Sequence, residues 1–369
     1  MIGFEPTPEQ HDLQRLAHEF AARELRPIAA QWDEREEYPP ELLAKAARAG
    51  LTAYAIPAEY GGGGADPVTG ALIAEELSWG CAGLAATITA TMFPVRPLLR
   101  FGTDAQRERY LPLLAREEGT LAAIAFTEAH AGSDVAAMRA EARRDGGSYV
   151  LRGEKVYITN GGIADLTVLF AKLDGQITAF LLEGGEAASG RVERKLGLRA
   201  SHTASVVLDD VRIPADRLLG DEGQGLEIAL DFFGVSRPQV AASAVGVARA
   251  AFEHATEYAR GREAFGKPIL SRQGVAFKLA DMAMLVEAAR LLVWRAAAAE
   301  DAGLLGSYAK AFAADAAMSI TTDAVQVLGG AGVMRDHPVE KWMRDAKVFQ
   351  IVEGTSEIQR HIVAAYLRG

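Results

Sequence analysis

Apolar residues recur at helical spacing in the first and last parts of the chain, and a strand-like pattern separates these two parts. The first helix is predicted from Thr7, because Thr7 suits a helix cap, Pro8 suits the first helical position and Gln10 follows three residues after the cap. Its apolar face is formed by Leu13, Leu16 and Phe20. Further helices are predicted at 40–49, 67–79, 83–92 and 104–116.

The glycine run GGGG at 61–64 could suggest a phosphate-binding loop. It lacks the Lys-Ser/Thr ending of such loops, and no apolar strand precedes it. We therefore expect it to be a flexible connection between helices.

The pattern changes near Leu121, where short β-rich runs are separated by Gly and Asp-Gly turns. These runs are LAAIAFTE, SYVLRGEKVYITN, LTVLFAKL, ITAFLLEG and TASVVLDDVRIP. After GDEGQG at 220–225, Ala-rich helices are predicted at 223–260, 271–301, 305–328, 336–346 and from about 355, with a kink or break at Pro238. The chain is thus predicted to be α+β and mainly α, with an α-helical domain at 1–119, a β domain at 120–220 and a second α-helical domain at 221–369.

Composition narrows the possible functions. A formal net charge of −10 lacks the basic surface that nucleic acids require. Cys81 is the only cysteine, which excludes an internal disulfide and favours a reducing compartment. The N-terminus MIGFEPTPEQHDLQ does not resemble a signal peptide, and the uncharged run from Cys81 to Val95 is too short to span a membrane. We expect a cytoplasmic protein with no membrane span and a buried helix at that run.

Several kinds of site can be set aside from the sequence. The seven histidines form no HExxH pair and no close spacing with Cys81, so no protein-held metal is expected. There is no GxSxG motif, and the segment LGGAGV at 328–333 has neither the spacing nor the preceding strand of a dinucleotide fingerprint.

Glu353, in FQIVEGTSEIQR, allows two interpretations. In the first, it closes a helix that ends at Gly354, and Ser356 with Gln359 forms a capping box for the next helix. In the second, apolar neighbours raise the pKa of the carboxylate and make it a general base.

Two segments rich in Gly, Ser and Thr lie at the edges of the β region, namely AFTEAHAGSDV at 125–135 and VYITNGG at 156–162. Backbone N–H groups and hydroxyls in such turns suit a polar ring system with a pyrophosphate. Ordinary turn chemistry is the alternative explanation.

Together with LGLRASHTASV, GREAFGKPI, QVLGGAGV and EKWMRDAKVFQIVEGTSEIQR, these segments resemble the acyl-CoA dehydrogenases in order and spacing, from about residue 7 to 366. The resemblance implies an N-terminal α-helical domain, a middle β-barrel-like domain and a C-terminal four-helix bundle. It also implies bound FAD. The implied reaction is α,β-dehydrogenation of an acyl thioester, in a homotetramer or homodimer that passes electrons to electron-transferring flavoprotein.

Carried over to this sequence, the resemblance makes Glu353 the catalytic base. It places Phe126, Thr127 and Ser133 at the flavin and pyrophosphate, and Tyr157 and Thr159 along the flavin ring. Thr355 and Glu357 return to the flavin. The adenine end is held by two subunits through Arg262, Phe265, Gln273, Gln326 and Gly330. Ser133, Arg237 and Gly354 are the implied substrate contacts, while Phe349, Ile351 and Val352 would desolvate the base.

The sequence also departs from the family pattern. Ala129 and His130 replace a usual Pro-Gly, His202 replaces Asp, and Ser236 stands where some members place the base. The changes at residues 129, 130 and 202 border the family's route for CoA and keep open a carrier-protein thioester, while Ser236 leaves Glu353 without a rival as the base. A flavin-binding partner subunit without turnover is a further alternative, against which the intact Glu353, Thr127 and Thr159 argue. Arg96 could face a polar acyl tail or be an ordinary exposed arginine.

Overall fold

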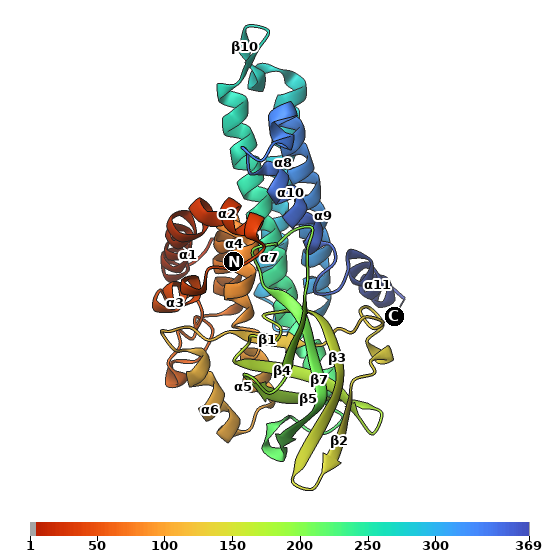
Figure 1. Cartoon of the computed structure of the whole chain (residues 1–369). Helices are drawn as coiled ribbons and strands as arrows, with labels where there is room; N and C mark the ends of the chain where they lie inside the picture. Colours follow the sequence, from red (N-terminus) through yellow and green to blue (C-terminus); the bar gives the residue numbers. More distant parts are fainter. Residues whose placement is uncertain (1–4, 369) are drawn as a thin grey trace.

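The computed structural model describes residues 5–368, which form an N-terminal helical region, a sheet from the middle of the sequence and a long helical bundle that extends away from the sheet (Figure 1). The predicted cap of the first helix is confirmed, because Thr7 and Gln10 exchange side-chain-to-backbone hydrogen bonds. The N-terminal region contains α1 (Pro8–Phe20), η1 (Ala21–Leu25), η2 (Arg26–Ile28), α2 (Ala29–Arg35), α3 (Pro40–Arg48), η3 (Ala58–Tyr60), α4 (Pro67–Ala90), α5 (Val95–Phe101) and α6 (Asp104–Leu114).

Three details of this region differ from the sequence prediction. The helices predicted at 67–79 and 83–92 form the single element α4, which is interrupted at Cys81 by extended backbone with φ −164° and ψ 112°. Helix α5 was not predicted. The glycine run is a packed turn rather than a flexible connection: Gly64 N–H donates to the Ile56 carbonyl over 2.8 Å, and a Cβ on Gly62 would lie 2.1 Å from that same oxygen.

By length and composition, the stretch Pro67–Phe101 is apolar enough to cross a membrane, and it is the one such helix among residues 5–368. However, 72% of its apolar 18-residue stretch is buried inside the fold. This agrees with the buried helix that the sequence predicts there.

The middle region is one eight-stranded sheet with the order β6-β7-β3-β2-β4-β5-β8, and β1 pairs in parallel with β4. Its strands are β1 (Ala122–Ala125), β2 (Glu141–Asp145), β3 (Ser148–Thr159), β4 (Leu166–Leu173), β5 (Gln176–Glu183), β6 (Ala188–Val192), β7 (Thr203–Pro214) and β8 (Leu218–Leu219), with η4 (Val135–Ala137) and η5 (Ala215–Arg217) between them. The register of β3 against β7 shifts between Lys155 and Ile158. Such a bulge redirects the intervening side chains.

The C-terminal region is an antiparallel bundle of α7, α8, α9 and α10, with a hairpin at its far end (Figure 1). Its elements are α7 (Gly225–Gly261), β9 (Glu263–Ala264), β10 (Lys267–Pro268), η6 (Ile269–Ser271), α8 (Gln273–Ala297), α9 (Gly303–Leu328), η7 (Gly329–Val333), α10 (Val339–Phe349) and α11 (Ser356–Tyr366). Of the kink or break expected at Pro238, the break is wrong, since α7 is one helix of 37 residues that contains Pro238. Packing against α4 and α9 on two sides outweighs the local cost of proline.

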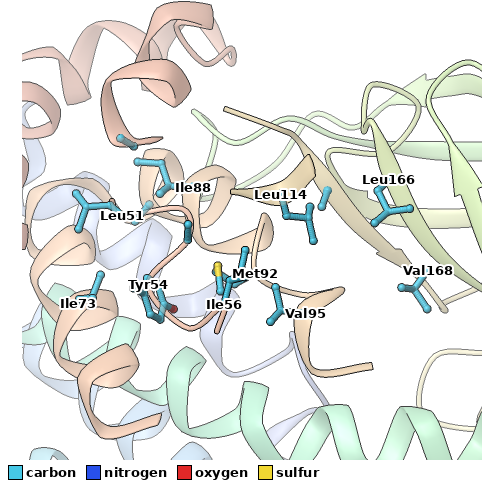
Figure 2. Packing of buried hydrophobic residues seen from close by; sticks show 14 of the residues in the cluster. Leu51, Tyr54, Ile56, Ile73, Ile88, Met92, Val95, Leu114, Leu166 and Val168 are labelled. Atoms are coloured by element: carbon cyan, nitrogen blue, oxygen red, sulfur yellow. The ribbon is translucent and has the colours of Figure 1, made fainter. Parts of the chain in front are cut away.

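The three regions share buried contacts. Figure 2 shows apolar side chains of the N-terminal region, such as Ile88 and Leu114, with Leu166 and Val168 of the sheet in one core cluster. Between α4 and the bundle, Glu75 accepts a hydrogen bond from Arg290 over 2.8 Å, and Glu76 accepts one from Arg249 over 2.9 Å. Paired charges of this kind fix how α4 sits on α7 and α8.

Candidate active site

Glu353 lies in the turn between α10 and α11, and both it and Gly354 adopt left-handed backbone, with φ of 54° and 86°. A non-glycine residue in this region is strained, and such strain is concentrated at functional sites. A Cβ on Gly354 would lie 2.7 Å from the Gln359 amide nitrogen. Because α10 ends at Phe349, the interpretation in which Glu353 closes that helix is wrong.

Two buried side chains hold the carbonyls of this turn. Gln359 donates from Nε2 to the Glu353 carbonyl over 3.2 Å and to the Gly354 carbonyl over 3.0 Å. Lys310 of α9 donates from Nζ to the Gly354 carbonyl over 2.6 Å. The predicted capping box of Ser356 and Gln359 is wrong, because Thr355 is the N-cap of α11 and its hydroxyl accepts a hydrogen bond from the N–H of Ile358, whose side chain cannot return one.

The Glu353 carboxylate accepts a hydrogen bond of 2.7 Å from the Ser236 hydroxyl of α7. Burial raises the pKa of Glu353, while the Ser236 hydrogen bond and the charges of Arg237 and Lys310 oppose the rise. The apolar wall expected around the carboxylate is only partly present within one chain. Phe349 is buried, but Ile351 and Val352 are 56% and 37% exposed.

Ser236 also lines a cavity of about 150 Å³ between α7, α5 with the connection before it, and the segment that leads into α4. Tyr54 and Gln239 are hydrogen-bonded to each other over 3.3 Å in its wall, and Figure 2 shows Tyr54 with two other lining residues, Met92 and Val95. The remaining apolar lining comes from Ala55, Ala65, Pro67, Phe93, Leu99, Phe232 and Val235.

Arg96 lies in the wall of this cavity but is already paired. Its Nε and one terminal nitrogen each donate to the Asp231 carboxylate over 2.7 Å. A bidentate pair of this kind satisfies the guanidinium. Arg96 is therefore neither a free partner for a polar acyl tail nor an ordinary exposed arginine.

The segment after β1 is fixed by a buried ion pair. Glu128 accepts hydrogen bonds from the Lys155 ammonium over 2.7 Å and from the backbone N–H groups of Arg139 and Ala140. The Thr127 carbonyl accepts a hydrogen bond from Val156 N–H over 2.9 Å, which joins this segment to β3. Phe126 is buried against Phe170 with centroids 4.9 Å apart, so its side chain faces the core.

The β3 edge presents the next predicted residues. Tyr157 has φ 61° and is 64% exposed, directly at the register shift, while Thr159 pairs with Thr203. Ser133 is exposed. His202 contacts the Gly161 carbonyl over 3.0 Å, so this departure from the family pattern has a structural partner in the adjacent turn.

The residues predicted at the adenine end lie far from Glu353 in the same chain. Arg262, Phe265 and Gln273 belong to the tip where α7 turns into α8, and Phe265 is 96% exposed. Gln326 and Gly330 lie at the end of α9, and the Lys278–Asp323 ion pair of 2.5 Å joins α8 to α9 near that end. The structure thus brings these five residues to one end of the bundle (Figure 1).

The residues present are compatible with FAD. A cavity of about 350 Å³ is lined by Thr355, Glu357, Lys347 and Arg360, and by Asp315, which pairs with Arg360 over 2.5 Å. Lys347 adds a positive charge there that suits a phosphate. Tyr157 offers an exposed aromatic ring, and Arg237 keeps a buried Nε without a hydrogen-bond partner. Within residues 5–368, no group of His, Cys, Asp or Glu side chains could hold a metal ion.

Sequence reasoning missed two members of the site, Lys310 and Gln359, as partners of the glutamate turn. A signal for Lys310 was available, because it is the one charged residue in the apolar stretch SYAKAFAA of α9. Gln359 was interpreted as a capping residue, and only the fold shows that its amide reaches back to the turn.

Comparisons with known proteins agree with this arrangement. Three acyl-CoA dehydrogenase family models match the chain: the N-terminal domain at residues 7–118, the middle domain at 123–211 and the C-terminal domain at 223–367. An acyl-CoA dehydrogenase of Bacillus subtilis (strain 168) is 43% identical, with 98% of this chain and 99% of that protein covered.

Two solved structures extend the comparison. Butyryl-CoA dehydrogenase from Megasphaera elsdenii superposes with a TM-score of 0.96 at 40% identity, and all of both chains is covered. The prolyl acyl carrier protein oxidase AnaB superposes with a TM-score of 0.94 at 32% identity, over 98% of this chain and 100% of the other.

Proposed function

Because the chain belongs to the acyl-CoA dehydrogenase family, we propose that it is an FAD-dependent enzyme that converts an acyl-CoA thioester to its α,β-unsaturated product. The observation that carries this proposal is the Glu353 carboxylate, which has a raised pKa and is bonded to Ser236 at the wall of an apolar cavity. The family resemblance extends over nearly the whole chain.

Glu353 removes the α-proton of the thioester as a carboxylate. Burial makes it a stronger base than an ordinary glutamate, which suits proton abstraction near neutral pH. Bound FAD supplies the acceptor for the hydride that leaves the β-carbon. The left-handed backbone at Glu353 and Gly354 sets the direction of the turn, and the backbone N–H of Glu353 is a candidate donor to the thioester carbonyl.

The remaining site residues hold the cofactor and substrate in this proposal. Thr127, Tyr157 and Thr159 of the β region, with the backbone of Phe126, would hold the flavin, and Ser133 would hold the pyrophosphate and substrate. Thr355 and Glu357, at the start of α11, would also hold the flavin. Arg237, half-buried beside Phe233, contributes positive charge near the Glu353 carboxylate.

The cavity favours a short acyl group. Its volume of about 150 Å³ is below the roughly 300–1,000 Å³ of pockets for drug-sized ligands. The Arg96–Asp231 pair neutralises the charge in its wall, so the cavity offers no free cation for an acidic tail. A carrier-protein thioester and a subunit without turnover are not favoured, because the more similar relatives and structures carry acyl-CoA dehydrogenase names.

Cofactor binding implies assembly. Ser236, beside Glu353, and Arg262, at the predicted adenine site, lie 26 residues apart along α7 and its C-cap. At about 1.5 Å per residue the helix separates these two sites by roughly 39 Å, which is longer than an extended FAD molecule. One FAD can therefore contact the Glu353 site and an adenine site only if two chains contribute. The exposed apolar residues Phe277 and Met284 of α8 provide surface for such a contact, in a homodimer or homotetramer.

We propose electron-transferring flavoprotein as the electron acceptor. We propose the cytoplasm as the location, since the single thiol, Cys81, is buried and unpaired in the described chain.

The function is tested by anaerobic bleaching of the purified flavoprotein with acyl-CoA and acyl-carrier thioesters of four to sixteen carbons. We expect the four- to six-carbon CoA thioesters to bleach the flavin fastest. Absence of bleaching by every thioester would refute the proposed activity.

A further inference from the structure

Lys310 is a buried cation that the proposed reaction does not use. Its side chain is 0% exposed on α9, in a segment that is otherwise apolar around it. A buried ammonium is costly unless it is hydrogen-bonded and close to compensating charge. Its hydrogen bond is to the Gly354 carbonyl, at 2.6 Å.

Resting on the function proposed above, we propose that Lys310 is a positioning residue that fixes the left-handed Glu353–Gly354 turn, so that the base and its backbone N–H keep their orientation toward the thioester. Glu353 occupies a strained conformation with φ 54°, and the backbone hydrogen bond that spans the turn runs from Ser356 N–H to the Gln350 carbonyl over 2.9 Å, which leaves the carbonyls of Glu353 and Gly354 to other partners. The Gly354 carbonyl accepts hydrogen bonds from Lys310 of α9 and from Gln359 of α11, and Gln359 also donates to the Glu353 carbonyl. The turn is therefore clamped between two helices that are separate in sequence.

Charge supports the same assignment. Burial lowers the pKa of Lys310 to about 8, while the carboxylates of Glu353 and Asp315 oppose this shift and the charge of Arg237 adds to it. Other charged groups near the turn are Arg360 and Glu357 of α11, and Arg360 pairs with Asp315 over 2.5 Å. The charge of the Lys310 ammonium thus stabilises the ionised form of Glu353, and its hydrogen bond to the Gly354 carbonyl holds the backbone beside it.

The test uses the FAD-loaded enzyme and three variants. Lys310→Met removes the donor and the charge but keeps an unbranched side chain. Gln359→Met removes the other donor to the same carbonyl and leaves Lys310 in place. Thr321→Val is the matched control, because Thr321 is also buried on α9 and its hydroxyl bonds only within that helix.

We expect Lys310→Met to lower the rate of flavin reduction at saturating substrate by about 10- to 10²-fold, the cost of a small misplacement of reacting groups. FAD occupancy should be unchanged. The pH–rate profile of Lys310→Met should shift relative to wild type. Hydrogen exchange should accelerate at the amides of residues 353–356, while the helices stay protected. Gln359→Met should accelerate exchange at the same amides, and Thr321→Val should match wild type in all measurements.

The proposal is overturned if Lys310→Met reduces flavin within twofold of wild type with the same pH profile, or if exchange at 353–356 is unchanged. It is also overturned if exchange rises evenly through α9, since Lys310 would then be a packing residue. If Lys310→Met does not fold, Lys310→Gln, which removes the charge but keeps a polar group in the buried segment, decides through the same exchange and rate measurements. Hydrogen exchange needs no turnover, so it distinguishes failure of this proposal from failure of the proposed activity.

Discussion

The Ser236 hydroxyl donates a 2.7 Å hydrogen bond to the Glu353 carboxylate, although the two residues are 117 positions apart in the chain. The sequence had identified Ser236 only as the position where some family members carry their base. The structure shows that the side chains at both positions meet, although one comes from α7 and the other from the turn before α11. A base at either position could therefore reach the same bound thioester.

Removing the base should abolish reduction without removing the cofactor. Glu353→Gln keeps size and hydrogen bonding but loses the basic oxygen, and general-base catalysis is worth about 10²–10⁴-fold. We expect at least that loss in the rate of anaerobic flavin bleaching, with FAD occupancy and thioester binding retained. Glu59→Gln, at an exposed glutamate, is the control. A Glu353→Gln rate within tenfold of wild type would show that another group is the base.

Moving the base should restore activity in part. In the double variant Ser236→Glu/Glu353→Gly, a carboxylate starts from α7, and glycine relieves the left-handed backbone at 353. We expect flavin reduction at least tenfold faster than in Glu353→Gly alone, measured by stopped-flow bleaching with the best thioester. Equal rates in the single and double variants would mean that a carboxylate on α7 cannot reach the substrate.

Glu353→Gln should also stabilise the fold in a pH-dependent manner. The pKa of Glu353 is raised above the usual 4.5 by burial, so the stability associated with its neutral form is present below pH 4.5 and is lost as pH rises through the folded pKa. Gln cannot ionise and avoids this loss. We expect the Tm difference between variant and wild type to increase from pH 4.5 to 8.5, as measured by circular dichroism. A constant difference, or a variant that becomes less stable at high pH, would contradict the assigned shift.

Enlarging the acyl cavity should change chain-length preference. Phe93 lines the cavity and packs edge-on against Phe232 at a centroid distance of 5.4 Å. Phe93→Ala should raise kcat/KM for eight-carbon over four-carbon acyl-CoA by about tenfold, since a methylene in a hydrophobic pocket is worth about 1–3 kcal/mol. Phe101→Ala, on α5 but outside the cavity lining, should leave the ratio unchanged. An unchanged ratio in Phe93→Ala would place the acyl chain elsewhere.

Charge reversal at the bundle tip should reduce flavin content. Arg262→Glu places a carboxylate where we propose that a cofactor phosphate from a neighbouring chain binds. We expect loss of FAD occupancy, by absorbance ratio, with unchanged helix content. Arg260→Glu is the matched control two residues away on the exposed end of α7. Full occupancy in Arg262→Glu, or in a demonstrably monomeric wild-type sample, would contradict FAD binding across two chains.

The sequence by itself determined the order of the three regions, most helices and the identity of Glu353 as a candidate base, because apolar spacing, caps and family motifs are local properties of the chain. It did not determine that α7 passes through Pro238 or that the glycine run packs tightly on Ile56, since packing with distant elements overrides local preference there. The placement of Ser236, Lys310 and Gln359 around Glu353 was also decided only by the tertiary structure. These residues come from α7, α9 and α11, and no spacing along the chain encodes which side chains meet when helices pack.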